Sequence, residues 1–300
     1  MKKLNENSVS KRKIKPFEGI MFFFLACYSA AIITLFVWSL LSSFKSELDL
    51  FNNPWGFDAD WTFENWSNVF NKLADKKYID GEKHLVYFEE MFFNSFLYST
   101  GGALATTFCT AVMAYCVAKY KGPVSTIIYY TVVVTLIFPV VGNLASMLKI
   151  TKLLKIYDNI VGLWVMKYGF NNLYFFIFYA AFDKISWEYA EAAFMDGASH
   201  FKVFFKVMLP LVGNLFGTVF LLNFIYCWND FETAYMYLPN HPTVSVILYT
   251  VINSGGSLVS QVNTPTQIAT AFMVFLPILV LFVIFKDKIM SNLTEGGIKG

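Results

Sequence analysis

The sequence predicts an all-α membrane protein with six transmembrane helices and both termini in the cytoplasm. Of its 300 residues 56% are hydrophobic and only 15% are charged, which is typical of a chain embedded in a bilayer. Polar loops separate apolar stretches that are long enough to cross the hydrocarbon core. We therefore expect a transmembrane domain over 17–285, between a cytoplasmic N-terminus (1–16) and a cytoplasmic tail (286–300).

The first half of this domain predicts three helices. The apolar run 17–43 follows a basic segment, which favours the cytoplasmic side, and it is too long for the core of a signal peptide. An outside loop follows at 45–90. The second helix is expected at about 91–119 and the third at about 124–147, with a kink at Phe138-Pro139.

The fourth segment, 160–182, is unusual because it contains Lys167, Gly169, Asn171 and Asn172. Unpaired amides near the middle of a bilayer are costly, and glycine weakens a helix. We expect a broken or bent helix that faces protein or water. The asparagines are candidates for a polar path across the membrane; alternatively, they bond neighbouring helices or hold the kink.

The fifth helix is predicted over 211–237 and the sixth over about 266–285, joined by an outer loop, 238–265, without charged residues. Asn223 and Asp230 are two turns apart on one face of the fifth helix, and its length places Asp230 near the outer surface. The candidates that this helix adds to the polar path are Asn223, Trp228, Asn229 and Asp230.

The cytoplasmic loop 183–210 predicts two short helices around a turn. Ser186 can cap the first helix, Gly197 can end it and Ser199 can cap the second. Apolar residues recur at i, i+3, i+4 and i+7 in the second helix, opposite two lysines: Phe201, Phe204, Phe205 and Met208 against Lys202 and Lys206. Pro210 suits the first turn of the next membrane helix.

A long motif runs through this loop. Glu191-Ala192-Ala193 is followed after three residues by Gly197, and after nine more by Val207, with Leu209-Pro210 at its end. The pattern resembles the EAA loop of ABC-importer permeases, with valine in place of isoleucine. The resemblance implies the type I ABC-importer permease fold and a loop that docks on a cytosolic ATPase. The residues expected to couple to that ATPase are Glu188, Glu191, Ala192, Ala193, Asp196, Gly197, Leu209 and Pro210.

Two further stretches resemble the carbohydrate branch of these permeases. Cys227-Trp228-Asn229-Asp230-Phe231 is similar to a segment of their fifth helix, and the last five residues are similar to the tail of the maltose-type subunit. In that subunit the tail enters the ATPase interface, so the resemblance implies that Gly296, Gly297 and Lys299 contact the ATPase.

The resemblance implies a subunit of an ATP-driven sugar importer in a bacterial plasma membrane. Its expected partners are a second, related permease, two ATPase subunits and an extracellular, lipid-anchored binding protein. ATP and Mg are expected on the ATPase, with no cofactor on this chain. The sequence leaves open which sugar is carried and whether this chain touches it. It also leaves open an importer of another solute, such as a peptide or amino acid, and a structural membrane subunit without transport.

Several other functions are disfavoured. No Gly-x4-Gly-Lys-Ser/Thr phosphate loop and no His-Glu-x-x-His motif is present, so we expect no enzyme. The histidines (His84, His200, His241) are scattered, which predicts no metal site, and the four cysteines lie in apolar segments, which predicts buried thiols. A net charge of +2 and a single arginine, Arg12, predict no nucleic-acid partner.

Overall fold

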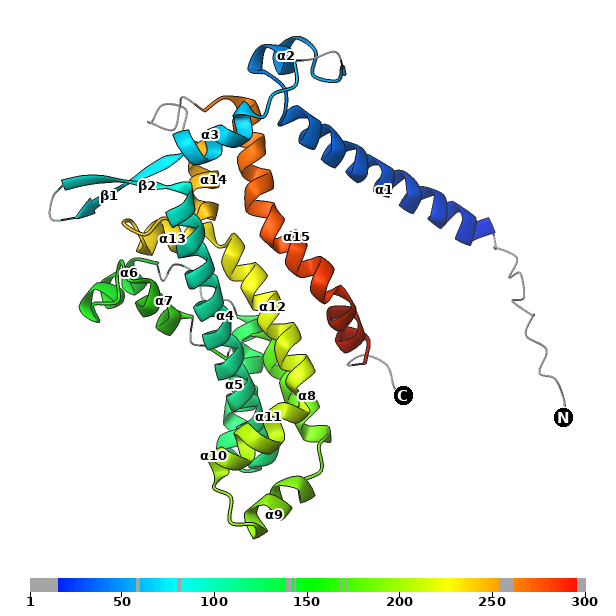
Figure 1. The fold of residues 1–300 in the computed structure, drawn as a ribbon. Coiled ribbons are helices and arrows are strands. Elements are labelled where there is room, and N and C mark those ends of the chain that lie inside the picture. Colours follow the sequence, from blue (N-terminus) through cyan, green and yellow to red (C-terminus); the bar gives the residue numbers. More distant parts are fainter. Residues whose placement is uncertain are drawn as a thin grey trace.

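The computed structural model describes residues 16–57, 60–79, 82–138, 142, 144–167, 169, 170, 172–253 and 262–295. It is an elongated bundle of helices with one two-stranded sheet within the described ranges (Figure 1). One end carries the β-hairpin of β1 (Ala74–Ile79) and β2 (Glu82–Tyr87), and the opposite end carries α9 (Glu188–Met195). We call these the hairpin end and the α9 end.

Three helices are long and apolar enough to cross a membrane by themselves. They are α1 (Pro16–Ser42), α4 (Phe88–Lys119) and the first part of α15 (Thr264–Glu295). If the bent pair of helices 200–211 and 213–229 is counted as one span, the number of such spans rises to four. The other predicted spans are interrupted, and α15 runs ten residues beyond the predicted end at 285.

Helix α1 stands apart from the bundle (Figure 1). It meets α15 through the Phe36 ring, whose centroid lies 5.3 Å from that of Phe272 and 5.9 Å from that of Phe275. Cys27 on α1 is therefore exposed, which corrects the prediction of a buried thiol. Cys109 and Cys227 are buried and Cys116 is partly buried, in the packed bundle.

The hairpin end contains more structure than the sequence predicted. The expected loop 45–90 folds into α2 (Glu47–Asn52), α3 (Glu64–Lys72) and the antiparallel hairpin, in which Ala74 pairs with Tyr87 and Ile79 with Glu82. The expected loop 238–265 contains α14 (Val244–Asn253). α14 is apolar and its backbone is tied to α4, since Val244 N donates to Ser95 Oγ at 2.8 Å.

Helix α4 is the centre of the bundle and packs against α7 (Ile160–Met166), α8 (Leu173–Lys184) and α12 (Gly213–Asn229). Gly101 makes the contact with α7 possible. A Cβ atom at that position would lie 1.9 Å from the Trp164 ring, so only glycine fits without a shift.

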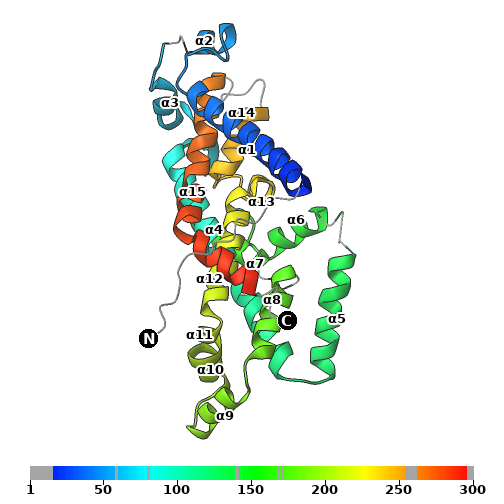
Figure 2. The same cartoon turned by 90° about the vertical axis from the view of Figure 1, so that its right-hand side faces the viewer.

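The third predicted helix ends early. α5 (Pro123–Ile137) stops before the expected kink at Phe138-Pro139, and α6 (Leu144–Leu153) follows as a separate element. Pro139 lies outside the described residues, so the kink itself is not tested. A single helix over 124–147 is wrong, and we attribute its early end to the proline and glycine that follow α5. Figure 2 shows α5 on one side of α8 and α12 on the other.

The fourth segment is broken, as predicted, into α7 and α8. Asn172 is the N-cap of α8, where its side chain accepts a bond from Phe175 N at 3.2 Å. The fifth segment is also broken, which corrects the expected continuous helix. α12 ends at Asn229 and α13 (Phe231–Tyr237) follows, because Asp230 caps α13 by accepting from Thr233 N at 3.0 Å.

Candidate functional site

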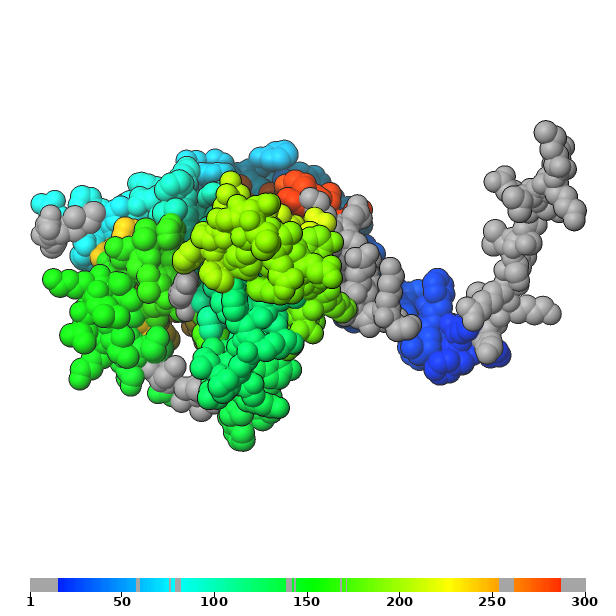
Figure 3. All heavy atoms as spheres, turned by 90° about the horizontal axis from the view of Figure 1, so that it is seen from below, coloured from blue at the N-terminus to red at the C-terminus, as the bar shows by residue number. Residues whose placement is uncertain are grey.

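The α9 end carries a projecting loop, residues 185–211. It contains α9, α10 (His200–Val203), the π-helix η1 (Phe204–Met208) and α11 (Leu209–Leu211). The view onto this end shows the loop in front of the bundle (Figure 3). It joins α8 to α12 and lies farther from the hairpin end than any other labelled element (Figure 1).

The turn between α9 and α10 has the geometry of a Schellman motif. Gly197 has a φ of +75°, the left-handed region that favours glycine. Gly197 N donates to Phe194 O at 2.9 Å and Ala198 N to Ala193 O at 3.0 Å. Both carbonyls at the end of α9 are thereby satisfied, and the predicted glycine turn is confirmed.

The two predicted serine caps differ in outcome. Ser199 caps α10 as expected, since its hydroxyl accepts from Lys202 N at 3.4 Å. The N-cap of α9 is Trp187, one residue later than predicted, and the Ser186 hydroxyl accepts from Glu188 N at 3.3 Å.

The predicted apolar stripe of the second helix is wrong in part. Phe204 and Met208 are buried, but Phe201 is 79% exposed. Phe205 is also exposed, and it lies within η1, whose wider turn departs from the α-helical period that the prediction assumed. The helix then bends by 82° between Leu211 and Gly213, so Pro210 belongs to α11 and not to the first turn of α12.

Aromatic contacts attach the projecting loop to the end of α4. The Tyr120 ring lies 5.8 Å from that of Trp187, and its hydroxyl is 2.8 Å from His200 Nδ1. His200 in turn meets Phe194 at 4.8 Å. Beside them, Lys121 Nζ lies 2.9 Å from Asp183 Oδ1, and this bond raises the pKa of Lys121. These contacts join the projecting loop to the C-terminal end of α4 and to the turn that follows it.

Most residues of the sequence motif lie on the surface of this loop. Glu191 and Ala192 are exposed, and beside them Met195 is 89% exposed and Tyr189 56% exposed. The remaining predicted coupling residues range from exposed to partly buried: Glu188, Asp196, Gly197 and Pro210 exposed, Ala193 and Leu209 partly buried. The predicted tail contacts Gly296, Gly297 and Lys299 lie outside the described residues.

A second polar group lies within the bundle, where the fourth and fifth segments are broken. Lys167 Nζ is 2.6 Å from Asp230 Oδ2, and Tyr98 OH donates to the same oxygen at 2.9 Å. The side chains of Lys167 and Asp230 are only 16% and 8% exposed. Sequence reasoning missed this pair. The available signal was a lysine within an apolar segment, which requires a nearby countercharge.

Three of the predicted path residues bond to neighbouring helices. Asn223 Nδ2 donates to Thr107 Oγ1 at 2.9 Å, and Asn172 Nδ2 donates to Thr110 Oγ1 at 3.0 Å. Trp228 is buried and donates to Val274 O at 3.0 Å. For the two asparagines, these contacts favour the alternative of bonds to neighbouring helices. Asn171 lies outside the described residues.

Asn229 and Asp230 do come together, because both line an open cavity of about 450 Å³ at the junction of α12 and α13, where Asn229 is exposed. The same cavity is lined by Tyr226, Asp230 and Glu232. A neighbouring cavity of about 340 Å³ lies between α6, α7 and α13 and shares Glu232.

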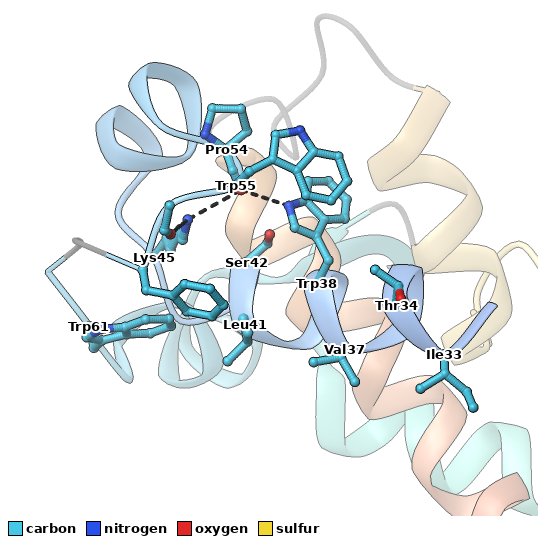
Figure 4. Close-up of a pocket in the computed structure, with 12 residues that line it drawn as sticks. Ile33, Thr34, Val37, Trp38, Leu41, Ser42, Lys45, Pro54, Trp55 and Trp61 are labelled. Atoms are coloured by element: carbon cyan, nitrogen blue, oxygen red, sulfur yellow. Dashed lines mark hydrogen bonds between the residues drawn. The ribbon is translucent and has the colours of Figure 1, made fainter. Parts of the chain in front are cut away.

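A third cavity, of about 350 Å³, lies at the hairpin end beside α1 (Figure 4). The buried Lys45 donates to the carbonyls of Asn53, Pro54 and Gly56 at 3.0, 3.3 and 2.6 Å. Trp38 Nε1 also donates to Pro54 O, at 2.7 Å. These bonds fix the turn after α2 on α1, and we assign this region a structural role.

Spanning helices, broken segments with buried polar groups and a projecting loop define the membrane subunit of a transporter. Residues 107–286 match the model of the family described as "Binding-protein-dependent transport system inner membrane component", and the chain belongs to that family. Its members are permease subunits and not enzymes, and the protein is a multi-pass protein of the plasma membrane.

Individual relatives cover most of the chain. It is 25% identical to the diacetylchitobiose uptake system permease protein NgcG of Streptomyces coelicolor, over 94% of this chain and 89% of that protein. It is also 25% identical to the arabinooligosaccharides transport system permease protein AraQ of Bacillus subtilis, over 87% of this chain and 88% of that protein. A solved chain of a bacterial ABC transporter involved in import of the acidic polysaccharide alginate has the same fold, with a TM-score of 0.73, 18% identity and coverage of 94% and 99%.

Proposed function

We propose that this chain is one of two permease subunits of an ATP-driven saccharide importer, and that it is coupled to a cytosolic ATPase through residues 188–210. The observation that carries the proposal is the projecting loop. It presents the motif residues Glu191 and Ala192 at its surface, is closed by the Schellman turn at Gly197 and is attached to α4 by aromatic contacts.

The proposed topology has six spans with the α9 end in the cytoplasm. The spans are α1, α4, α5, the pair α7 and α8, the pair α12 and α13, and α15. The ends of α1 and α15 that continue toward the termini are both directed to the α9 end (Figure 1), which supports cytoplasmic termini. The hairpin end then faces the extracellular binding protein.

The surface of the projecting loop suits a cleft on a partner. Its exposed acids, Glu188, Glu191 and Asp196, can pair with basic groups, while Met195 and Tyr189 supply apolar contact. Ala192 permits close approach. We also propose that Gly296, Gly297 and Lys299 contact the ATPase, which carries the ATP and Mg; deletion of 296–300 tests this part.

The substrate class follows from the relatives. NgcG and AraQ are described as permeases for diacetylchitobiose and arabinooligosaccharides, and SugB of Mycobacterium tuberculosis, 28% identical over 70% of this chain, as a permease for trehalose. All three substrates are saccharides. We therefore propose an oligosaccharide, delivered by a binding protein to the two permeases.

Charge reversal on the projecting loop tests the proposal. In proteoliposomes with the ATPase, second permease and binding protein, Glu191→Lys should abolish ATP-dependent saccharide uptake, because it reverses a charge at the proposed docking surface. Glu18→Lys, exposed in the first turn of α1 and outside the projecting loop, is the matched control and should retain uptake. Normal uptake by Glu191→Lys would contradict the coupling role, and absence of uptake by the unmodified complex for every saccharide would contradict the importer.

A further inference from the structure

The residues that line the cavity at the junction of α12 and α13 indicate the chemical class of the substrate. One stripe of α12 faces it, with residues at i, i+3, i+4 and i+7: Leu222, Ile225, Tyr226 and Asn229. Asn229 is 16 residues from the start of α12, about 24 Å along the helix, toward the hairpin end. In the proposed topology this is the half of the membrane that faces the binding protein.

The cation beside this cavity is already neutralised. Lys167 forms the 2.6 Å ion pair with Asp230, and its ammonium also lies 5.3 Å from the centre of the Tyr226 ring. The Asp230 carboxylate is also hydrogen-bonded, because its oxygens accept from Lys167, Tyr98 and Thr233 N. The two charges of the pair compensate each other, so the pair adds no net charge to the two cavities that Asp230 and Lys167 line.

The charged group that remains open is an acid, Glu232. Asn229 donates one amide hydrogen to Ile225 O at 2.9 Å, which leaves its side-chain oxygen as an acceptor and its second amide hydrogen as a donor. Glu232 is exposed, and the ion pairs found within the described ranges do not include it. Since Glu232 lines both neighbouring cavities, it gives their described lining one net negative charge.

From these groups we infer that Asn229 and Glu232 select for saccharides that are neutral or carry an amino group, and against acidic ones. Hydroxyl and ammonium groups can donate to both open acceptors, whereas a carboxylate cannot donate and is repelled by Glu232. The exposed face of Tyr226, which is 66% exposed, offers apolar contact to a sugar ring. The solved alginate transporter shares only the fold with this chain, so its acidic substrate does not bear on this lining.

This inference rests on the proposed function, but its first test needs no substrate. Ile225→Cys, in a Cys27→Ser background, places a thiol in the cavity without removing a polar group of the site. In the assembled complex, a cationic methanethiosulfonate reagent should modify this thiol severalfold faster than an anionic one. Glu232→Gln should remove most of that preference, while Glu82→Gln on the hairpin should leave it unchanged. A preference that Glu232→Gln does not alter would overturn the inference.

The second test compares uptake of a neutral trisaccharide, its amino analogue and its uronic-acid analogue by the complete importer. The binding protein is the same for every variant, so a change in relative uptake reports on the permease. Glu232→Gln should lower uptake of the amino form relative to the neutral form by severalfold, and should raise that of the acidic form if the binding protein admits it. Uptake with unchanged ratios would overturn this inference alone. Absence of uptake for all three, in the unmodified complex, would overturn the proposed function as well.

Discussion

The ion pair between Lys167 and Asp230 makes a quantitative prediction. Asp230→Asn keeps the size of the side chain and an oxygen that can accept from Thr233 N, so the cap of α13 persists. The substitution removes the charge that faces Lys167 at 2.6 Å, and the lysine side chain is only 16% exposed. Loss of one partner from a buried pair costs about 3–5 kcal/mol. We expect a loss of stability of that size.

The double variant Lys167→Met/Asp230→Asn separates the charge from the packing. Methionine keeps the length of the lysine stem and leaves no ammonium to bury, so most of the stability lost in Asp230→Asn should return. The assay is reversible unfolding of the complex in lipid nanodiscs with SDS, followed by tryptophan fluorescence. Glu232→Gln, exposed on the next helix, is the control and should change stability by less than about 0.5 kcal/mol.

Two results would refute this reasoning. If Asp230→Asn is as stable as the unmodified protein, Lys167 is not held as a buried charge. If the double variant loses at least as much stability as Asp230→Asn and Lys167→Met, each measured alone, lose together, the two side chains do not interact as a pair.

Three further predictions concern packing and turns. Gly197→Val should reduce saccharide-stimulated ATPase activity, since a left-handed φ of +75° costs a side chain about 1–2 kcal/mol and more for a β-branched one. Gly101→Ala should lower the yield of assembled complex in size-exclusion chromatography, because its Cβ would lie 1.9 Å from the Trp164 ring. Asn223→Leu should destabilise the protein by about 0.5–2 kcal/mol in the same SDS assay, because Thr107 loses its bond across two helices.

Each of these predictions has a control. Gly213→Ala and Gly217→Ala add a methyl group that meets no atom within 4 Å beyond the adjacent residues and the nearby backbone of its own helix, so both should behave like the unmodified protein. Equal effects of Gly197→Val and Gly213→Ala would contradict the role of the turn, and normal assembly of Gly101→Ala would contradict the close contact of α4 with α7. If Asn223→Leu loses uptake without a loss of stability, the predicted structural role of Asn223 is wrong. That result would favour a place for Asn223 on the substrate path.

The features that the sequence predicts well are local. The turn at Gly197 depends on bonds that span five residues, from Ala198 to Ala193, and the cap at Ser199 on a bond that spans three. The break between α7 and α8 follows from polar residues within one apolar segment. Such features are fixed by neighbouring residues, so a residue pattern contains the necessary information.

The features that it misses depend on distant partners. Lys167 and Asp230 are 63 residues apart, and Asn223 and Thr107 are 116 apart, so their pairing follows only from the way the helices pack. The π-helix η1 is a small change of winding that the apolar spacing did not reveal. The hairpin and α14 lie in segments for which the sequence predicts loops, because neither segment contains an apolar stretch long enough to span a membrane.

The central claim is that the projecting loop couples this permease to an ATPase, and a cross-link tests it most directly. Ala192→Cys in the assembled complex should form an adduct with the ATPase chain when a short bifunctional thiol reagent is added, and its yield should change with ATP. Glu82→Cys on the hairpin should form none with that chain. Absence of an Ala192→Cys adduct in every nucleotide state, from a complex that still imports saccharide, would contradict the account.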